Sequence, residues 1–562
     1  MAGKILTPTS IWNGFTVPND LAVERISKND SASISEEKIY LSGRKAKGGS
    51  VKIFCELIMS RSLKQAPAIL LLQDFEQPTD SVLINDLVSN GYIVLKVDLA
   101  GATNSDEPHT VYPESISYAN YANVKDNLFK VESEADKTCW YEWVAVARTA
   151  LAYLKRLSFV TKVGGFAIGE AATVLWQVAG TDKELDSAVF AFNAGWAGYR
   201  GINKFAGGKE PQFSDNMYKF IAGIDAQSYA MHVKCPVYAL IATNSPIYDC
   251  DRAFDTLSYV KDEYYSGINY SVGSVDQISG LAYKNALSFF KKTLFKTEET
   301  FPSNVEIKGM IRGGKVVITA SPDQKGLKDI DVYVSEQKVV PCKRSWKKLN
   351  FIKTKDDEYV FEYSPFATSK IVTAFAVAEY QDGFTVGSNV ISIKFDDSEV
   401  TSIFKSNVIY SSRGDSMESS FFSITETDAP SKIITTEKPF ISVKRGPMGI
   451  LGMTGSAGLC TLKVGCDKYR IPEGAMLMLD VYAKTKSTLT VTLTCDYFGA
   501  KREYLVCVPV RGGSVWQNVQ LEINKFKTIE GMPLRSYENI EALSFNVDEQ
   551  KGEYLINNVL WV

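Results

Sequence analysis

The chain has 562 residues, 45% of them hydrophobic and 23% charged, a composition typical of folded globular proteins. Its 62 basic and 65 acidic residues leave a formal net charge of −3, which gives no reason to expect a nucleic-acid partner. No apolar run reaches the ~20 residues that a membrane-spanning helix needs, so we expect no membrane span.

The numbers of histidine and cysteine residues limit the catalytic and metal-binding chemistry that the chain can perform, and the cysteines also bear on the cellular compartment. His109 and His232 are the two histidines of the chain, and general-base and zinc chemistry depend on histidine more than on other side chains. The nine cysteines form no C-x-x-C pair and lie mostly in apolar stretches, so we expect reduced core thiols and no metal site built on them. Because the N-terminus shows no apolar signal-peptide core, we expect a cytoplasmic protein, or a secreted one if a native N-terminus was trimmed.

Residues 20–297 alternate strand and helix signals, which predicts a mostly parallel sheet with helices on both faces. An antiparallel pair at 38–41 and 51–57 comes first. The stretch 68–72 is continuously apolar, which is typical of a strand buried on both faces. Further strands are expected at 92–97, 188–192, 236–241 and 269–272, and helices at 81–89, 140–154 and 281–294.

The stretch Lys162–Ala172 takes a glycine-rich strand directly into a run of helix formers. Within it, Gly165, Ala167 and Gly169 match the G-x-S-x-G nucleophile elbow, with alanine in place of the serine. The glycines suit the tight strand-to-helix corner, where backbone approaches backbone. A methyl group cannot act as a nucleophile, so we predict that the corner is kept and the reaction is lost.

The order of these elements resembles that of the α/β-hydrolases of the dienelactone hydrolase and acetyl xylan esterase kind, over roughly residues 35–295. The landmarks are Asp98 at a strand end, the elbow at 165–169, and Cys235-Pro236-Val237 at the entry to a late strand. The resemblance implies an ester hydrolase with a serine nucleophile, a histidine base, an acid and an oxyanion loop.

The other catalytic parts that this resemblance implies are absent or altered. The loop at 272–279, where the histidine is expected, has none. The acid is expected after the strand that Pro236 opens, and Asp249 is the candidate there. The oxyanion loop reads Gln73-Asp74-Phe75, and a carboxylate from Asp74 would oppose an oxyanion. We therefore predict that no catalytic residues remain.

Two further side chains in this part are candidates for chemistry. Cys139 would need a histidine base to act as a nucleophile, and its apolar surroundings favour core packing. Glu170 would be a pocket carboxylate, but glutamate is ordinary in the first turn of a helix because the helix dipole favours it there. We interpret both as structural.

Residues 303–396 change to a pattern of short strands between turns, with no helix signal among them. This pattern predicts a small antiparallel sandwich of immunoglobulin-like form, with Trp346 in its core. Its strands are expected at 315–320, 330–334, 358–363, 371–377 and 390–393.

Residues 400–562 are again all-β, and their closing strand at 554–561 resembles that of the jelly-roll carbohydrate-binding modules. The resemblance implies a jelly roll with carbohydrate as the first ligand to consider. The aromatic candidates for a sugar-stacking face are Tyr497, Phe498, Tyr504 and Trp516. We expect no cofactor. A structural calcium ion is the one alternative, with candidate ligands Asp480, Asp496 and Asp548, although a structural role as turn residues is favoured for these aspartates.

The sequence thus predicts three domains and a catalytically inactive, α/β-hydrolase-like protein with a binding or assembly role. Two alternatives stay open. One is an active esterase in which His109 or His232 is the base and Ser158 or Ser187 the nucleophile, although neither serine has flanking glycines. The other is a self-associating structural protein, because exposed edges of β-sandwiches can pair between chains.

Overall fold

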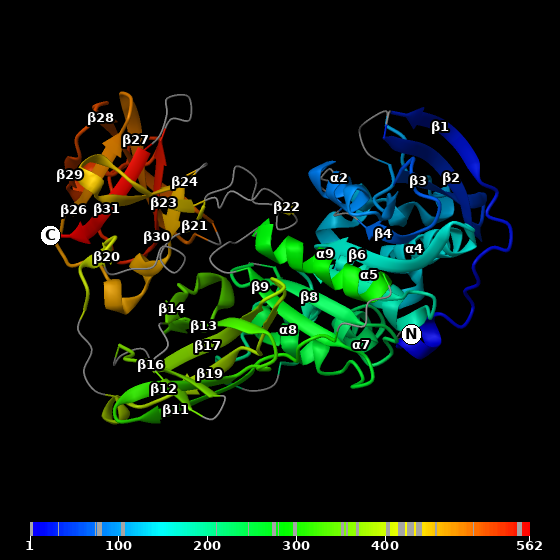
Figure 1. Ribbon diagram of the computed structural model, residues 1–562, viewed down its shortest axis with the longest axis horizontal. Helices are drawn as coiled ribbons and strands as arrows, with labels where there is room; N and C mark the ends of the chain where they lie inside the picture. Colours follow the sequence, from blue (N-terminus) through cyan, green and yellow to red (C-terminus); the bar gives the residue numbers. More distant parts are fainter. Residues whose placement is uncertain are drawn as a thin grey trace.

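The computed structural model of the chain has three regions, which follow one another from blue to red in Figure 1. Two of them are all-β, and the first is built on a large sheet. The structure describes the whole chain except residues 1–3, 32, 73–74, 76–80, 103–106, 209–210, 246, 272–276, 279, 296–299, 350–352, 356–357, 367–369, 401–404, 414–421, 424–431, 434–440, 456–457, 498–499 and 548–553.

A nine-stranded sheet in the order β1-β2-β3-β5-β4-β6-β7-β8-β9 organises the first region. The strands from β5 through β4 to β9 are parallel, and the pairs β1–β2, β2–β3 and β3–β5 are antiparallel. This mixed, mostly parallel sheet agrees with the predicted α/β-hydrolase arrangement. The strands are β1 Glu24–Asp30, β2 Ile34–Ala46, β3 Gly49–Ser60, β4 Ala66–Leu72, β5 Ile93–Val97, β6 Val160–Ile168, β7 Ser187–Ala191, β8 Val237–Ala242 and β9 Ser266–Ser271.

Helices cover both faces of this sheet, as the run of buried residues along β4 shows. Side chains alternate along a strand. Leu70 and Leu72 therefore pack with α4 (Cys139–Arg156) and α5 (Glu170–Thr181), and Leu71 packs with helices of the opposite face. Those helices are α2 Ser81–Ser89 and α9 Gly280–Leu294. The remaining helices are α1 Pro8–Ile11, α3 Tyr121–Val124, α6 Asp215–Gly223, α7 Ala226–Ala230 and α8 Cys250–Leu257.

The second region consists of two antiparallel sheets, which agrees with the prediction of a β-sandwich. One has the order β11-β12-β16-β15, and the other β14-β13-β17-β18, with β19 also on β17. The strands are β11 Glu306–Arg312, β12 Lys315–Ser321, β13 Leu327–Glu336, β14 Lys347–Leu349, β15 Lys353–Lys355, β16 Glu358–Tyr363, β17 Ile371–Tyr380, β18 Thr385–Gly387 and β19 Ile391–Lys394.

The second region packs tightly against the first. Inner-face residues of both its sheets share one hydrophobic cluster with α2, α9 and one face of the large sheet. The predicted place of Trp346 inside the sandwich is wrong: its ring packs on Phe375, in the cluster that includes α4, α5 and Tyr270. Phe375 points away from the sandwich interior because its neighbours on β17, Ala374 and Ala376, point into it.

The third region forms a separate lobe with its own hydrophobic core, on the left in Figure 1. It has one sheet in the order β23-β24-β31-β26-β29, with β20 on β31, and a second in the order β21-β25-β30-β27-β28. The strands are β20 Val408–Tyr410, β21 Phe422–Ser423, β23 Ile441–Arg445, β24 Leu451–Gly455, β25 Leu459–Thr461, β26 Leu477–Ala483, β27 Ser487–Cys495, β28 Arg502–Val510, β29 Gln517–Leu521, β30 Ile540–Val547 and β31 Tyr554–Trp561. Two short strands, β10 Gln277–Ile278 and β22 Lys432–Ile433, pair in parallel.

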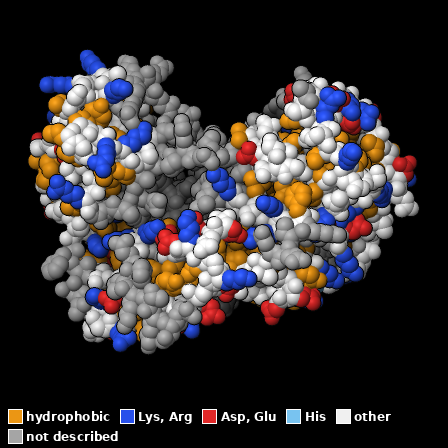
Figure 2. All heavy atoms as spheres, viewed as in Figure 1, with side chains coloured by type: hydrophobic (Ala, Val, Ile, Leu, Met, Phe, Trp, Pro, Cys, Tyr) orange, Lys and Arg blue, Asp and Glu red, His pale blue; other side chains and the backbone are white. Residues whose placement is uncertain are grey.

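On the face of the molecule shown in Figure 2, lysine and arginine side chains are scattered among neutral and hydrophobic ones, over the third region as well as over the rest of the molecule. The described helices include none that is long and apolar enough to cross a membrane. Hydrogen bonds also join the third region to the second. The backbone N–H of Asp467 donates to Gln337 Oε1 at 2.7 Å, and Lys343 pairs with Glu541 at 2.7 Å.

Candidate functional site

The strand-to-helix corner between β6 and α5 lies at Gly169. Strand β6 ends at Ile168 and α5 begins at Glu170, so Gly169 is the single residue between them. Its φ of 61° and ψ of −134° are a conformation that L-residues rarely adopt. In a nucleophile elbow the nucleophile occupies the strained corner residue, so at this corner the residue in that place has no side chain at all.

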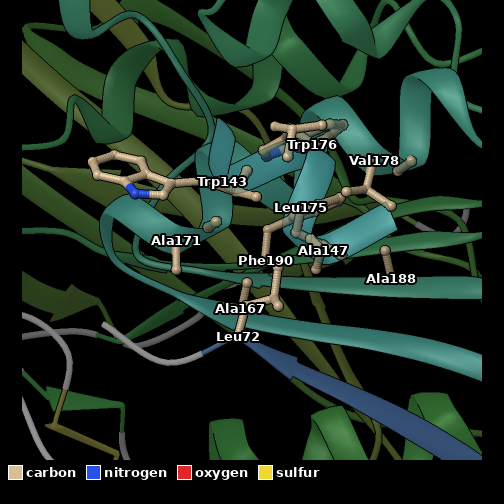
Figure 3. Close-up of a cluster of buried hydrophobic side chains, with 14 of the residues drawn as sticks. Leu72, Trp143, Ala147, Ala167, Ala171, Leu175, Trp176, Val178, Ala188 and Phe190 are labelled. Atoms are coloured by element: carbon tan, nitrogen blue, oxygen red, sulfur yellow. The ribbon is translucent and has the colours of Figure 1, made fainter. Parts of the chain in front are cut away.

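Ala167, which the G-x-S-x-G spacing places at the nucleophile position, lies two residues earlier, inside β6. It is fully buried and pairs with Leu72 of β4 and Phe190 of β7. Figure 3 shows its methyl group among these hydrophobic side chains, with Leu175 of α5 nearby. Gly165 has a packing role, because a Cβ atom there would lie 2.5 Å from Cδ1 of Leu175.

The buried amide of Asn193, from the loop after β7, holds the corner. Its Nδ2 donates to the carbonyl oxygen of Gly169 at 3.2 Å and to Thr173 Oγ1 at 2.7 Å. Its Oδ1 accepts the backbone N–H of Gly195 at 2.9 Å, and the N–H of Gly169 donates to Ala191 O at 3.0 Å. Helix start and sheet end are thus tied together by structural hydrogen bonds.

Asp249, the candidate acid, caps the N-terminus of α8. Its Oδ1 accepts the backbone N–H of Asp251 at 2.9 Å, and its Oδ2 lies 3.2 Å from Arg252 Nε. Burial and the neighbouring Asp251 carboxylate raise the pKa of Asp249 to about 6. The side chain therefore acts as a helix cap with an elevated pKa, and its described contacts include no histidine.

A fully buried ion pair lies beside Asp249 and joins the first two regions. Arg344, which follows a short helical turn at Pro341–Lys343, donates to Asp251 through Nη1 at 2.5 Å and Nη2 at 2.7 Å. Neither side chain is exposed to solvent. This two-point geometry is the strongest form of a carboxylate–guanidinium contact, and burial makes each partner dependent on the other.

Asn244, just after β8, makes the same connection through its amide. Its Nδ2 donates to the carbonyl oxygens of Cys342 at 2.9 Å and Arg344 at 2.7 Å. Parallel strands bring their carboxyl ends to one edge of a sheet, and α/β proteins bind ligands there. At the ends of β8 and β9, that edge is a docking surface for the loop at 341–346 of the second region.

Both serines and His232 of the esterase alternative lie away from Gly169, at the opposite edge of the sheet. Ser158 precedes β6 and Ser187 begins β7, so both lie at the amino ends of strands, on the edge of the sheet opposite the corner. His232 precedes β8 and lies at that same opposite edge. His109 follows β5, where its Nδ1 is 3.0 Å from Glu107 O and its carbonyl accepts from Tyr40.

Cys139 is buried at the first position of α4, and burial raises the pKa of its thiol, which keeps it protonated. Glu170 lies in the first turn of α5. Of the predicted oxyanion loop, Gln73 and Asp74 are outside the described residues, while the ring of Phe75 lies 4.3 Å from that of Trp143. Most of the loop at 272–279 also lies outside the described residues.

The aromatic candidates of the third region do not share one face. Trp516 precedes β29 in one sheet, and its Nε1 donates to Pro447 O at 3.2 Å. Tyr504 is on β28 of the other sheet and packs against the core. Tyr497 follows β27, where Lys501 Nζ lies 4.8 Å from its ring centroid. Phe498 is outside the described residues.

The three calcium candidates are not brought together by the described part of the chain. Asp480 lies on β26, and Asp496 follows β27 in the other sheet, where it accepts the N–H of Ala500 at 2.9 Å. Asp548 is outside the described residues. Among the residues that the structure describes, no group of three or more His, Cys, Asp or Glu side chains could hold a metal ion.

Sequence reasoning missed Asn193, Asn244, Asp251 and Arg344, which make the principal contacts at this edge. Asn193 and Asn244 each follow an apolar strand closely, and a polar residue at the carboxyl end of a strand is the one signal that would have marked them. Nothing local in the sequence marks Arg344 as the partner of Asp251, because the two residues lie 93 positions apart in the chain.

Solved structures resemble this chain at low sequence identity and over about half of its length. No family model and no curated protein matches the chain. A similar solved structure is the acetyl xylan esterase from Paenibacillus sp. R4, with 12% sequence identity, 48% of this chain and 88% of that chain covered, and a TM-score of 0.37. Another is Acetyl Xylan Esterase 1 from Thermoanaerobacterium sp. JW/SL YS485, with 12% sequence identity, 45% of this chain and 81% of that chain covered, and a TM-score of 0.33. The acylaminoacyl peptidase from Pyrococcus horikoshii is similar at 12% identity (49% and 50%, TM-score 0.34). The sheet order of the chain itself, and not these likenesses, defines the fold of the first region.

Proposed function

We propose that this chain is a catalytically inactive, α/β-hydrolase-like protein that acts by binding, with the third region as its ligand-binding part. The observation that carries the loss of catalysis is the corner between β6 and α5, where the residue in the nucleophile's place is Gly169. A glycine offers no hydroxyl, thiol or carboxylate, so no covalent intermediate can form on it.

The edge of the sheet around Gly169 supports the same proposal. Asn193 uses its amide on the corner itself, and Asn244 uses its amide on the second region. The place of the catalytic acid is taken by a helix cap, Asp249, beside the buried Asp251–Arg344 pair. Asn193 thus holds the corner, and Asn244 and the Asp251–Arg344 pair hold the first two regions together, which is a scaffold's use of the edge where a hydrolase would bind substrate.

A serine-directed fluorophosphonate probe tests the loss of activity on the full-length chain. We expect no labelling of the wild type, because no serine lies at the corner. We also expect none for Gly169→Ser or Ala167→Ser, because a serine hydroxyl needs a base to become a nucleophile. An active serine esterase labelled in parallel is the positive control.

Two outcomes would contradict the proposal. Ester hydrolysis by the wild type that is abolished by His109→Ala or His232→Ala would make the protein an esterase with an unusual base. Labelling of Gly169→Ser alone would show that a base lies within reach of the corner, and would contradict the loss of the catalytic machinery as a whole.

A further inference from the structure

The outer face of the sheet β23-β24-β31-β26-β29 carries an unusual combination of side chains. Along β26 the core takes Leu477, Leu479, Val481 and Ala483, so the alternate residues Asp480 and Tyr482 point outward. Next to β26, Asn518 and Gln520 of β29 point to the same side, since Val519 and Leu521 pack toward the core. We call the set Asp480, Tyr482, Trp516, Asn518, Gln520 and Asn558 the Trp516 face.

The Nε1–Cζ2–Cη2 edge of the Trp516 indole faces backbone that lacks side chains. A Cβ atom at Gly452 would lie 2.7 Å from Cη2 of the indole, and one at Gly446 would lie 2.9 Å from Cζ2. The bond from Trp516 Nε1 to Pro447 O fixes the rotation of the ring. Two glycines thus make room for the indole, whose position is set before any ligand arrives.

A second aromatic ring extends this platform. The ring centroid of Tyr482 lies 6.0 Å from that of Trp516, with 51° between the planes. Both side chains are partly exposed. A partly exposed pair of rings held this way presents an apolar surface to a ligand at little loss of side-chain entropy, because the rings are already ordered.

A hydrogen-bonded row of polar side chains lies beside the rings. Asp480 accepts from Asn518 Nδ2 through Oδ1 at 3.0 Å and from Asn558 Nδ2 through Oδ2 at 2.7 Å. Gln520 Nε2 donates to Asn518 Oδ1 at 3.1 Å. Each amide in the row has a second N–H, and each carboxylate oxygen can accept a second bond, so the row is oriented and retains capacity for a ligand.

We propose that the Trp516 face binds a neutral carbohydrate. Aromatic rings match the apolar C–H face of a pyranose, and oriented amide and carboxylate groups match hydroxyls that both donate and accept. The Asp480 carboxylate at the centre of the row opposes an anionic ligand. This inference rests on the proposed binding function of the third region and names its surface and its ligand class.

The absence of hydrolysis and the presence of sugar binding are measured separately, so the two proposals fail separately. Ester hydrolysis would overturn the first and leave sugar binding intact. Failure to bind any saccharide would overturn the second and leave the lack of turnover intact.

Affinity electrophoresis of the full-length chain through gels containing soluble xylan, mixed-linkage β-glucan or a soluble α-glucan tests the proposal, together with a glycan array of neutral oligosaccharides. We expect at least one class of polysaccharide to retard the migration of the wild-type protein. In Trp516→Ala the dissociation constant for that polysaccharide should rise by about tenfold or more. Asn518→Ala should weaken binding as well, and Asn518 is an exposed side chain whose removal leaves the core untouched.

Tyr259→Ala is the matched control, because it removes an exposed aromatic ring that lies outside the third region. We expect its binding to equal that of the wild type. Trp516→Phe keeps an aromatic platform and should retain most of the affinity, which separates a loss of stacking from a loss of folding. No binding to any neutral saccharide, or equal binding by the wild type, Trp516→Ala and Asn518→Ala, would overturn the proposal.

Discussion

At the scale of single residues, a nucleophile elbow has two properties, a strained backbone conformation and the G-x-S-x-G spacing, and in this chain they belong to two different residues, Gly169 and Ala167. Gly169 has the strained backbone and Ala167 has the sequence spacing. The motif pointed to the right corner but not to the residue at its apex, because a G-x-A-x-G pattern contains no information on which residue leaves the strand. The conformation of the backbone decides that, through the first hydrogen bonds of α5.

The conformation of Gly169 makes a testable contribution to stability. Replacing it with alanine forces a Cβ atom into a region with φ of 61°, so we expect the first region to lose about 1–3 kcal/mol of unfolding free energy. Gly14→Ala is the control, because its φ is ordinary and no atom lies within 4 Å of the added methyl group. Urea unfolding checks both, and equal stability of the two variants would contradict the predicted strain.

The cysteines should differ sharply in reactivity. Seven of the nine are buried, and burial raises the pKa of Cys235 and Cys466 to about 12, which keeps these thiols protonated. Cys507 on β28 is exposed. We expect a disulfide reagent such as DTNB to react first with one thiol of the native protein, and Cys507→Ser to remove that fast phase. A fast phase that persists in this variant would contradict the prediction.

Asp225 should make stability depend on pH. Burial raises its pKa to about 6, although it accepts bonds from the Ala226 N–H at 3.1 Å and Gln227 Nε2 at 3.0 Å. The folded state therefore holds this proton more tightly than the unfolded state, so its contribution to stability grows as pH falls from 7 to 5 and is lost as pH rises through 6. We expect about 1 kcal/mol between these pH values.

The variant Asp225→Asn isolates this contribution, because asparagine does not titrate. Denaturant unfolding of the wild type and the variant at pH 7 and pH 5 gives two differences. The gain in unfolding free energy from pH 7 to pH 5 should be larger for the wild type than for the variant by about 1 kcal/mol. Other carboxylates contribute equally to both proteins and cancel in this comparison. Equal differences would show that Asp225 keeps an ordinary pKa.

At the scale of elements, α8 and the loop at 341–346 form a joint between two regions through Asp251 and Arg344. Removing one partner leaves an uncompensated buried charge, so Arg344→Met or Asp251→Asn should each destabilise the protein by about 3–5 kcal/mol. The double variant should be less destabilised than the sum of the two single variants, because it buries no lone charge. A double-mutant cycle by thermal unfolding measures this, and additive effects would contradict a coupled pair.

At the scale of the whole molecule, residues up to 396 should unfold as one unit and the third region as another. The first two regions share both hydrophobic clusters, and hydrogen bonds from Tyr238 to Thr385 O and from Tyr270 to Ser388 O cross between them. The third region has a core of its own. We expect calorimetry to resolve two transitions.

Truncation sharpens this prediction. Removing residues 397–562 should leave in place the transition in which the first two regions unfold together. Removing everything after residue 297 should abolish that transition, because it exposes Phe289 and Tyr238. A stable fragment of residues 1–297 would contradict the shared core. The predicted boundary at 297–303 would then be a physical boundary as well as a change in sequence pattern.

The sequence by itself determined the type and order of most elements, because alternation and helical spacing are local. The buried strand β4, the helix α4 and the short strands after residue 303 all follow from such patterns. It did not reveal the edge strand β1, whose residues are all exposed and carry no alternation, nor the short helices α6 to α8.

Only the tertiary structure decided what the elements do together. Which residue stands at the corner, which arginine neutralises Asp251, and which polar residues share a face with Trp516 all depend on contacts between distant parts of the chain. Asp480, Asn518 and Asn558 lie on three strands, and neighbouring strands need not be neighbours in sequence. The sequence can name the side chains of a site, but the register of the sheet decides which of them meet.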